Sequence, residues 1–318
     1  MMPAIFRRLL GRSAQAPGWL AFDFSERVVG VAHVRVDAGR PVVQFAEERE
    51  WDAAEPKSLA RVAAEFDAHR FRCTTLLRAK EYNLLLVEAP KVKPEELKAA
   101  MRWRIKDMLD YHVDDATIDV LDVPAPPNAA ARAHYMYTVT SRTETVRDIA
   151  NRFEAAKIPL SVIDIPETAQ RNVAAYLEAD QRGLLALTFD DQGGLVTVNF
   201  AGELYLSRRL EVTSGDFVEA DVEGRNRLLE RVLVETQRSL DHCERTYPFF
   251  SLGRVVLGPV PEEIGLREHL STNLYLPVEA LDLGRVAQLP AAEDWSLAKQ
   301  ARWLKLIGAG LRVEKKAL

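Results

Sequence analysis

The same order of expected elements occurs twice along this chain, and this repetition constrains the fold more than any single motif. In each half, three runs with β-strand character are joined by short turns and followed by a helix with one apolar face. The expected strands lie at 19–23, 28–36 and 42–49 and again at 184–189, 194–200 and 203–212, and the expected helices at 59–69 and 226–247. A duplicated α/β fold with two lobes and a cleft between them follows from this order.

The length of the chain agrees with two lobes. The chain has 318 residues, whereas a single hydrophobic core stops growing at about 250–300 residues. We expect a first lobe at 17–180 and a second lobe at 181–313, with tails at 1–16 and 314–318. Pro124 to Pro127 mark the clearest loop of the first half.

Charge and the placement of cysteine and histidine argue against several classes of protein. A formal net charge of −5 argues against a nucleic-acid-binding protein, because that function usually needs a strongly basic surface. The two cysteines, Cys73 and Cys243, are far apart and have no neighbouring ligand, and the six histidines lack ligand spacing. We therefore expect no metal site and a protein of the reducing cytoplasm.

The first residues and the hydropathy bear on any contact with a membrane. Arg7, Arg8 and Arg12 occupy the stretch where a secretory signal needs an apolar run. No run reaches the roughly 18 apolar residues that a transmembrane helix needs. We expect a protein that spans no membrane and reaches one through partners or through this short basic leader.

Several short strings are spread along the chain. They are WLAFD at 19–23, LLVEAP at 85–90, EELKAAMRWRIKD at 95–107, GELYLSR at 202–208, ETQRSLD at 235–241, LPVE at 276–279 and IGAGLR at 307–312. Together they resemble the actin-like pilus assembly proteins of the PilM family, and most closely those of the MSHA-pilus (MshI) type. They occur in the same order in that family, and the resemblance extends over roughly residues 17 to 313.

The resemblance implies an actin-like (ASKHA, ribonuclease H-like) fold with a small subdomain inserted in the first lobe at about 72–125. It implies a cytoplasmic scaffold, peripheral at the inner membrane, that docks the N-terminal cytoplasmic peptide of a single-pass pilus protein (PilN- or MshJ-like). Such a scaffold helps to link the periplasmic alignment complex to the motor ATPase. The peptide groove would involve the strand formed by Leu84, Leu85, Leu86 and Val87, together with the helix that carries Trp103.

The orientation of Trp103 leaves two interpretations open. Leu97, Met101 and Ile105 form an apolar stripe on a helix that begins near Pro94, and this stripe covers a sheet. Trp103 projects about 160° from the stripe. It therefore faces either a partner or the neighbouring lobe.

In actin-like folds two glycine-bearing hairpins hold the phosphates of ATP, because a residue without Cβ lets backbone N–H groups approach the oxygens. The first hairpin here keeps Asp23, but Ser25 replaces the expected glycine and Glu26 adds a negative charge. A carboxylate at that point repels a triphosphate unless Mg²⁺ intervenes.

The second hairpin and the adenosine turn also depart from the family pattern. Thr188 aligns with the expected aspartate, and Gly193 and Gly194 follow an acidic turn. At the adenosine turn, Gly258 is followed by two prolines, which stiffen the loop. If nucleotide binding were retained, we expect it to involve Asp23, Ser25, Gly193, Gly194, Gly258 and the long-helix pair Glu235 and Arg238.

We therefore expect a scaffold without effective ATP hydrolysis, without catalytic residues and without a required cofactor. One alternative is an actin-like ATPase that binds ATP with Mg²⁺ and regulates pilus assembly. Another is the equivalent adaptor of a type II secretion or cell-division system. Asp164 is the only placed candidate for a catalytic aspartate, and capping of the following helix explains it equally well.

Overall fold

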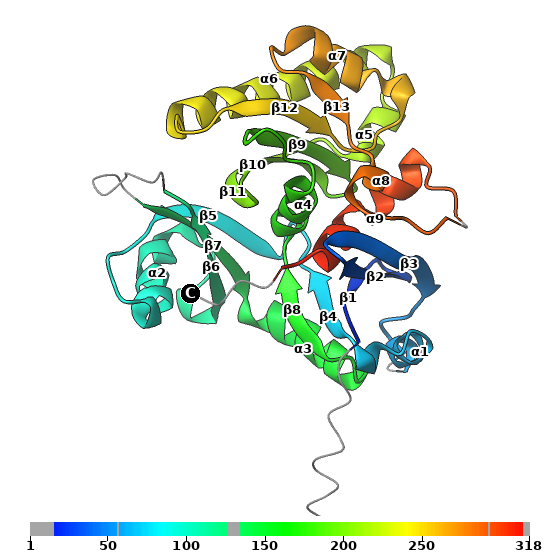
Figure 1. The fold of residues 1–318 in the computed structure, drawn as a ribbon. Helices are drawn as coiled ribbons and strands as arrows, with labels where there is room; N and C mark the ends of the chain where they lie inside the picture. The colour runs from blue at the N-terminus through cyan, green and yellow to red at the C-terminus, as the bar shows by residue number, and fades with distance from the viewer. Residues whose placement is uncertain (1–15, 56, 126–133, 292, 314–318) are drawn as a thin grey trace, which may run out of the picture.

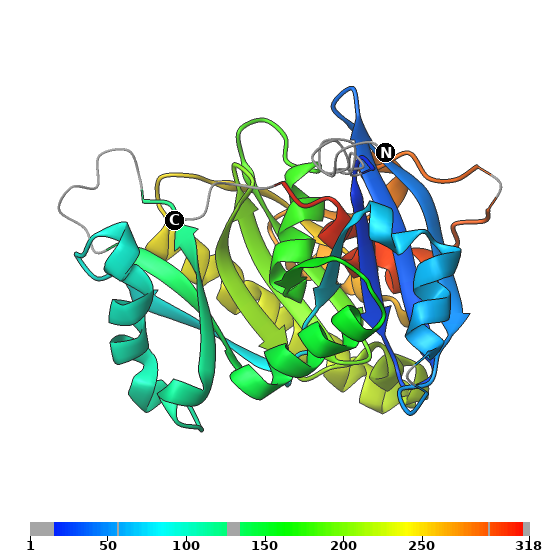
Figure 2. The same cartoon turned by 90° about the horizontal axis from the view of Figure 1, so that it is seen from below.

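The computed structural model describes residues 16–55, 57–125, 134–291 and 293–313. Two five-stranded sheets and one three-stranded sheet form its β-structure. Figure 1 shows the two larger sheets stacked with two helices between them, further helices on their outer sides, and the smaller sheet beside the stack. Figure 2 shows the same arrangement from below, with the smaller sheet and its helix at one end.

The first five-stranded sheet has the strand order β3-β2-β1-β4-β8. Its strands are β1 (Trp19–Phe24), β2 (Val28–Asp37), β3 (Arg40–Glu50), β4 (Arg72–Leu76) and β8 (Leu160–Asp164). β1, β2 and β3 form an antiparallel meander, β4 runs parallel to β1, and β8 runs parallel to β4.

The second five-stranded sheet repeats this topology in the order β11-β10-β9-β12-β13. Its strands are β9 (Gly183–Asp190), β10 (Gly193–Phe200), β11 (Glu203–Leu210), β12 (Leu252–Leu257) and β13 (Val278–Ala280). The last two strands again run parallel to the first strand of the meander. The expected duplication of an α/β unit is confirmed.

The two meanders also share a turn. Ala38 and Gly39 join β2 to β3 with φ values of +47° and +82°, and Ala201 and Gly202 join β10 to β11 with +53° and +73°. Two consecutive residues with positive φ make a type I′ turn, whose twist matches that of the flanking strands. Glycine supplies one of the two positions in each turn without a steric penalty.

Helices cover both faces of each five-stranded sheet. α1 (Ser58–Glu65) and α3 (Thr143–Ala155) pack on the outer face of the first sheet, and α6 (Val222–Thr246) and α7 (Leu266–Asn273) on the outer face of the second. α4 (Pro166–Ala175) and α9 (Leu297–Gly310) lie between the sheets. The remaining helical segments are α5 (Ser214–Glu219), α8 (Leu283–Val286), η1 (Ala68–Arg70), η2 (Pro94–Glu96), η3 (Lys106–Met108), η4 (Val113–Asp115) and η5 (Glu262–Ile264).

The two central helices are exchanged between the halves of the chain. α4 follows the first sheet but packs against β10 and β11 of the second, whereas α9 follows the second sheet and packs against β1 and β2 of the first. The two helices lie very close to each other where Gly308 of α9 faces Ala169 of α4. A Cβ on Gly308 would lie only 2.3 Å from the carbonyl oxygen of Ala169. The expected division at residue 180 therefore separates the two sheets but not their covering helices.

The three-stranded sheet belongs to an inserted subdomain. It has the order β5-β7-β6, with β5 (Tyr82–Glu88), β6 (Ala116–Val123) and β7 (Tyr135–Arg142), and α2 (Leu97–Ile105) covers one of its faces. The inserted subdomain begins and ends later than the expected bounds of about 72–125, because its sheet extends from Tyr82 to Arg142. β4 hydrogen-bonds to β1 and β8 and is part of the first sheet, while the central strand β7 lies beyond residue 125.

Several sequence expectations concern single residues or short segments. Cys73 and Cys243 are free and buried, and burial raises the pKa of each thiol to about 12. None of the helices within the described ranges is long and apolar enough to cross a membrane. The basic leader, the tail at 314–318 and most of the loop that begins at Pro124 lie outside the described residues.

Candidate functional site

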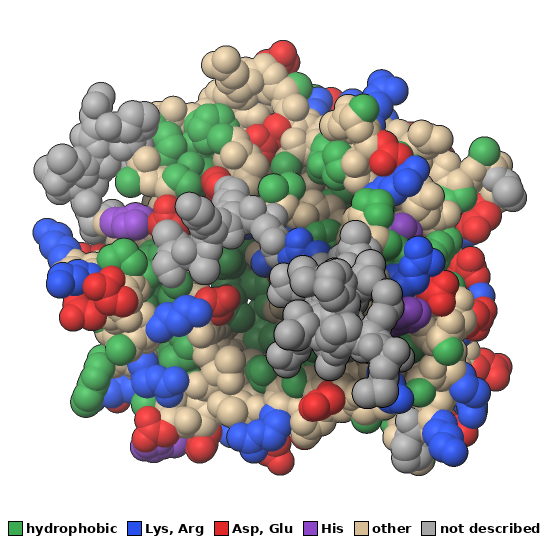
Figure 3. Space-filling view, turned by 60° about the horizontal axis from the view of Figure 1, so that its bottom comes forward, with side chains coloured by type: hydrophobic (Ala, Val, Ile, Leu, Met, Phe, Trp, Pro, Cys, Tyr) green, Lys and Arg blue, Asp and Glu red, His purple; other side chains and the backbone are tan. Residues whose placement is uncertain are grey.

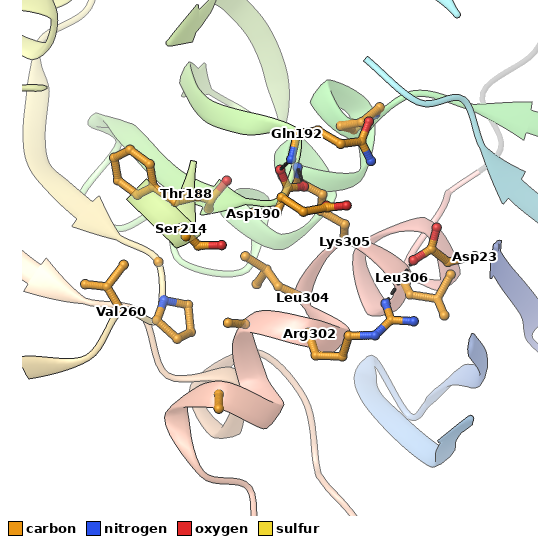
Figure 4. Close-up of a pocket in the computed structure, with 18 of the residues that line it drawn as sticks. Asp23, Thr188, Asp190, Gln192, Ser214, Val260, Arg302, Leu304, Lys305 and Leu306 are labelled. Atoms are coloured by element: carbon orange, nitrogen blue, oxygen red, sulfur yellow. Dashed lines mark hydrogen bonds and ion pairs between the residues drawn. The ribbon is translucent and has the colours of Figure 1, made fainter. Parts of the chain in front are cut away.

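A cavity of about 760 Å³ lies between the two lobes. Its wall comes from the ends of β1, β4 and β9, from α5, from the loop after β12 and from one side of α9. Figure 4 shows this cavity with the charged side chains Asp23, Arg302, Asp190 and Lys305 toward one side and Val260 toward the other.

In the first hairpin, Ser25 hydrogen-bonds within the turn, and an arginine of α9 neutralises the charge of Asp23. The Ser25 hydroxyl donates to the carbonyl oxygen of Val28 at 2.9 Å, so it completes the turn between β1 and β2. Asp23 Oδ2 accepts from Nη1 of Arg302 at 2.9 Å, and the Nε of Arg302 donates to Glu48 at 2.6 Å. The aspartate that an actin-like site would use near Mg²⁺ is therefore held in an ion pair.

The second hairpin is neutralised in a similar way. Asp190 at the end of β9 forms an ion pair with Lys305, one helical turn beyond Arg302 on α9. The side chain of Gln192 in the same turn accepts from the backbone N–H of Ala79 at 2.6 Å, and Ala79 belongs to the first half of the chain. The turn that would face phosphates thus contacts the first lobe directly.

A third, more exposed ion pair joins the loop after β4 to the turn after β9, next to the contact between Ala79 and Gln192. Arg78 lies 3.6 Å from Asp191, and both side chains line the cavity. The exposed fractions of 46% and 74% make this pair weak, because water screens it.

Close packing explains why glycine occupies the three positions that the sequence analysis assigned to a nucleotide site. A Cβ on Gly193, whose φ is +128°, would lie 2.7 Å from the carbonyl oxygen of Leu210, and a Cβ on Gly194 would lie 2.8 Å from the ring of Phe189. Neither glycine lines the cavity, whereas Gly258 does. A Cβ on Gly258 would lie 2.9 Å from the methyl group of Thr188, so this glycine lets the loop pass close to β9.

Glu235 and Arg238 lie outside the cavity lining. Glu235 accepts from Arg208 at 2.8 Å and from Arg238 at 2.6 Å. The hydrogen bond from Arg208 is the main cause that lowers the pKa of Glu235, and the one from Arg238 adds to it. This pair therefore forms a charge network between α6 and β11 and does not contribute to the cavity.

Asp164 has a structural role. Its Oδ1 accepts from the N–H of Ile165 at 2.9 Å and from the hydroxyl of Thr168, so it links the end of β8 to the first turn of α4. Its other oxygen pairs with Arg312 at 2.6 Å. Asp164 does not line the cavity. The helix-capping interpretation is wrong, because the N-cap of α4 is Ile165 and its first turn has no side-chain cap.

The cavity lining fits a magnesium nucleotide poorly. Among the described residues that line it, the cations are Arg78, Arg302 and Lys305, and each is paired with a carboxylate. A triphosphate would compete for these cations and would face the carboxylates that they now neutralise. A Mg²⁺ ion at Asp23 or Asp190 would have to displace an arginine or a lysine.

The strand proposed to contact a partner has two different faces. Leu85 and Val87 pack into the cluster around α2. Leu84 packs against the cores of both lobes, and by alternation Leu86 points to the same lobe-facing side. Leu86 remains 38% exposed. β5 is also one edge of its sheet, where an added strand can pair.

One face of the molecule is hollowed. Figure 3 shows a recess with hydrophobic side chains in its wall, in the middle of this face. Trp103 is not on the lobe-facing side of β5, because α2 covers the opposite face of the small sheet. Its side chain is 72% exposed and lies beside Lys106. The interpretation in which Trp103 packs against the neighbouring lobe is therefore wrong.

Sequence reasoning missed a buried polar contact between three parts of the molecule. The hydroxyl of Tyr82 in β5 donates to Glu167 in α4, and Arg209 in β11 lies 3.0 Å from the same carboxylate. Burial is the main cause that raises the pKa of Tyr82. No pattern in the sequence indicates this contact, because Tyr82, Glu167 and Arg209 are far apart along the chain.

Comparisons with known proteins establish the fold. Neither a protein-family model nor a curated protein matches this sequence. A structure of a PilM–PilN type IV pilus biogenesis complex matches with a TM-score of 0.72 and 17% identity, covering 93% of this chain and 98% of that chain. A protein from Bacteroides thetaiotaomicron with an actin-like ATPase fold and unknown function matches with a TM-score of 0.50 and 11% identity, covering 91% of this chain and 96% of that chain.

A lower likeness is to the cytoplasmic domain of EpsL, an inner-membrane component of the type II secretion system of Vibrio cholerae. Its TM-score is 0.47 at 12% identity, with 91% of this chain and 94% of that chain covered. The chain has an actin-like fold, as the sequence resemblance implied, with a duplicated α/β unit and an inserted subdomain.

Proposed function

We propose that this chain is a cytoplasmic scaffold of the inner-membrane assembly platform of a type IV pilus of the MSHA type. It docks the N-terminal cytoplasmic segment of a single-pass, PilN- or MshJ-like membrane protein, and through that complex it helps to connect the platform to the motor ATPase. It associates with the membrane through this partner and does not hydrolyse ATP effectively.

The observation that carries the proposal is the match to the PilM–PilN complex over 98% of that chain. The match therefore includes the inserted subdomain as well as the two lobes. That complex contains a PilN partner by its description, and a shared shape over the full length supports a partner of the same kind here. The fold alone does not fix a function, so the partner must be tested directly.

The free edge of β5 supports a peptide as the occupant. An extended segment can add to the β5 edge through main-chain hydrogen bonds, while its side chains contact the exposed part of Leu86. This mode needs an edge strand, which β5 supplies, and an apolar contact beside it, which Leu86 offers. Trp103 would contact only a partner that extends around α2.

A titration with a synthetic peptide of the partner's cytoplasmic segment tests this docking. Leu86→Asp should weaken binding at least about tenfold, because a carboxylate would be placed in an apolar contact. Val36→Asp is a matched control, since Val36 is also exposed, at 51%, but lies in β2 of the first sheet. Equal affinity of the Leu86 variant and the wild type would refute docking at β5. Trp103→Ala reports whether the peptide also reaches α2.

Calorimetry with MgATP tests the second part of the proposal. We expect no binding heat at millimolar nucleotide, because Asp23 and Asp190 are paired with Arg302 and Lys305. Binding in the micromolar range, about −8 kcal/mol, would instead support the alternative of an ATP-regulated assembly factor.

A further inference from the structure

The interlobe cavity has a charged end in which every cation already has a partner. Arg302 contacts Asp23 and Glu48, and Lys305 contacts Asp190. Both cations come from α9, where residues three apart lie on the same side of the helix. This end of the cavity is internally neutralised and offers little to a polyanion or to a metal ion.

The other end of the cavity is open and largely apolar, although Glu219 of α5 also lines the cavity. Phe217 and Val218 of α5 and Val260 of the loop after β12 form its second-lobe wall, and Leu297 and Leu304 of α9 form the opposite wall. Val218 is 69% exposed and Leu297 is 39% exposed, although both line the cavity. Figure 4 shows Val260, Leu304 and the Ser214 hydroxyl near one another on this side.

Exposed apolar side chains on facing walls of a concave site indicate a ligand, because their contact with water is unfavourable and a bound molecule removes it. The whole cavity, of about 760 Å³, lies within the range of roughly 300–1,000 Å³ that small-molecule sites occupy, and the apolar end is one part of it. A few polar groups, such as Ser214, can orient such a molecule.

We propose that this cleft binds an uncharged, largely apolar small molecule without a metal ion. The ligand occupies the end between α5 and α9, and the α9 cations remain paired with their carboxylates. This site is separate from the β5 docking surface, so the inference goes beyond the scaffold function and does not depend on it.

The test is a fluorescence titration of the full chain with Nile red, an uncharged apolar fluorophore. We expect a saturable, blue-shifted signal that neither EDTA nor MgATP reduces. Val218→Asp combined with Leu297→Asp should raise the dissociation constant at least about tenfold, because it places charges in the apolar wall. Ala301→Trp, which fills the cavity from α9 without adding a charge, should give a similar loss.

Val222→Asp is the matched control, because Val222 is 78% exposed at the start of α6 and does not line the cavity. Its affinity for Nile red should equal that of the wild type, and circular dichroism should show the same fold for all variants. A fluorescence signal that does not saturate would overturn the proposal. So would a dissociation constant for Nile red that is unchanged in both cavity variants, or displacement of Nile red by MgATP. Peptide docking should be unchanged in the cavity variants, which separates failure of this inference from failure of the scaffold proposal.

Discussion

At the residue scale, the carboxylate of Glu167 joins the inserted subdomain, the central helix α4 and the second lobe. Its side chain is 1% exposed, and its partner Arg209 is 31% exposed. Glu167→Gln keeps the shape but removes the charge, which leaves Arg209 without its counter-ion. We expect urea unfolding to show a loss of about 2–4 kcal/mol in the free energy of unfolding.

A matched control for this change is Glu211→Gln. Glu211 also pairs with an arginine, Arg231, but its side chain is 93% exposed. Exposed pairs contribute about 0–1 kcal/mol, so the control should unfold almost like the wild type. Equal losses in the two variants would contradict the structural role of Glu167.

His33 makes the stability depend on pH. It is 8% exposed, its Nε2 lies 3.0 Å from the carbonyl oxygen of Pro17, and burial is the main cause that lowers its pKa below 6.5. Because the unfolded chain takes up the proton first, the free energy of unfolding should fall as the pH drops below about 6.5 and should level off below the folded pKa. Chemical unfolding at several pH values measures this slope.

His33→Gln should reduce that slope, whatever its effect on stability at neutral pH. His112→Gln provides the control, since the His112 side chain is 72% exposed. A slope that stays the same in the His33 variant would show that other groups cause the pH dependence.

The cavity residues show how far sequence reasoning reached. Asp23, Ser25 and Gly258 were expected at a cleft and do line it, because hairpin positions follow from the repeated strand order. Arg302 was not expected there. It lies 279 residues from Asp23 in sequence, and only the packing of α9 on the first sheet brings the two together.

At the element scale, α4 and α9 cross with very little space between them. Gly308→Ala should cost about 1–3 kcal/mol in unfolding free energy, because the new methyl group would overlap the backbone of Ala169, at 2.3 Å. Intrinsic helix propensity alone predicts the opposite sign, a gain of up to about 1 kcal/mol. The sign measured by thermal or urea unfolding therefore decides between packing and propensity.

Gly215→Ala is the control for helix propensity. Gly215 lies in α5, and the nearest atom to an added Cβ is 3.7 Å away. This variant should be as stable as the wild type or slightly more stable. If both variants gained stability, the close approach of α4 and α9 would be refuted.

The strands and helices were largely predictable from the sequence. The packing of α4 and α9 on the sheet of the other half was not. Periodicity and turn residues located the two meanders, since the Ala-Gly turns at 38–39 and 201–202 end one strand and begin the next. β6 was missed, although its exposed Thr117 and Asp119 alternate with the buried Ala116, Ile118 and Val120 as the two faces of a strand do. Which sheet a helix covers depends on contacts distant in sequence, so the placement of α4 and α9 required the structure.

At the scale of the whole molecule, the two lobes have a shared core. The cluster between the sheets combines Ala21 and Val34 of the first sheet with Leu184 of the second and with residues of α4 and α9. The Lys305–Asp190 ion pair and the contact of Gln192 with Ala79 add polar links at the cavity. A lobe that unfolded alone would expose the helix that covers the other sheet.

This arrangement predicts one cooperative unfolding transition for the whole chain. The five tryptophans, Trp19, Trp51, Trp103, Trp295 and Trp303, lie outside the second sheet and its outer helices, so their fluorescence reports on the first lobe, the inserted subdomain and the α9 region. Phe249→Trp would place a reporter in the aromatic cluster next to Tyr205 and Tyr247. Urea midpoints from native fluorescence, from the new reporter and from circular dichroism should coincide, as they do when no intermediate is populated. Separate midpoints for the two reporters would show that the lobes unfold independently, and the exchange of α4 and α9 would then contribute less to stability than their packing implies.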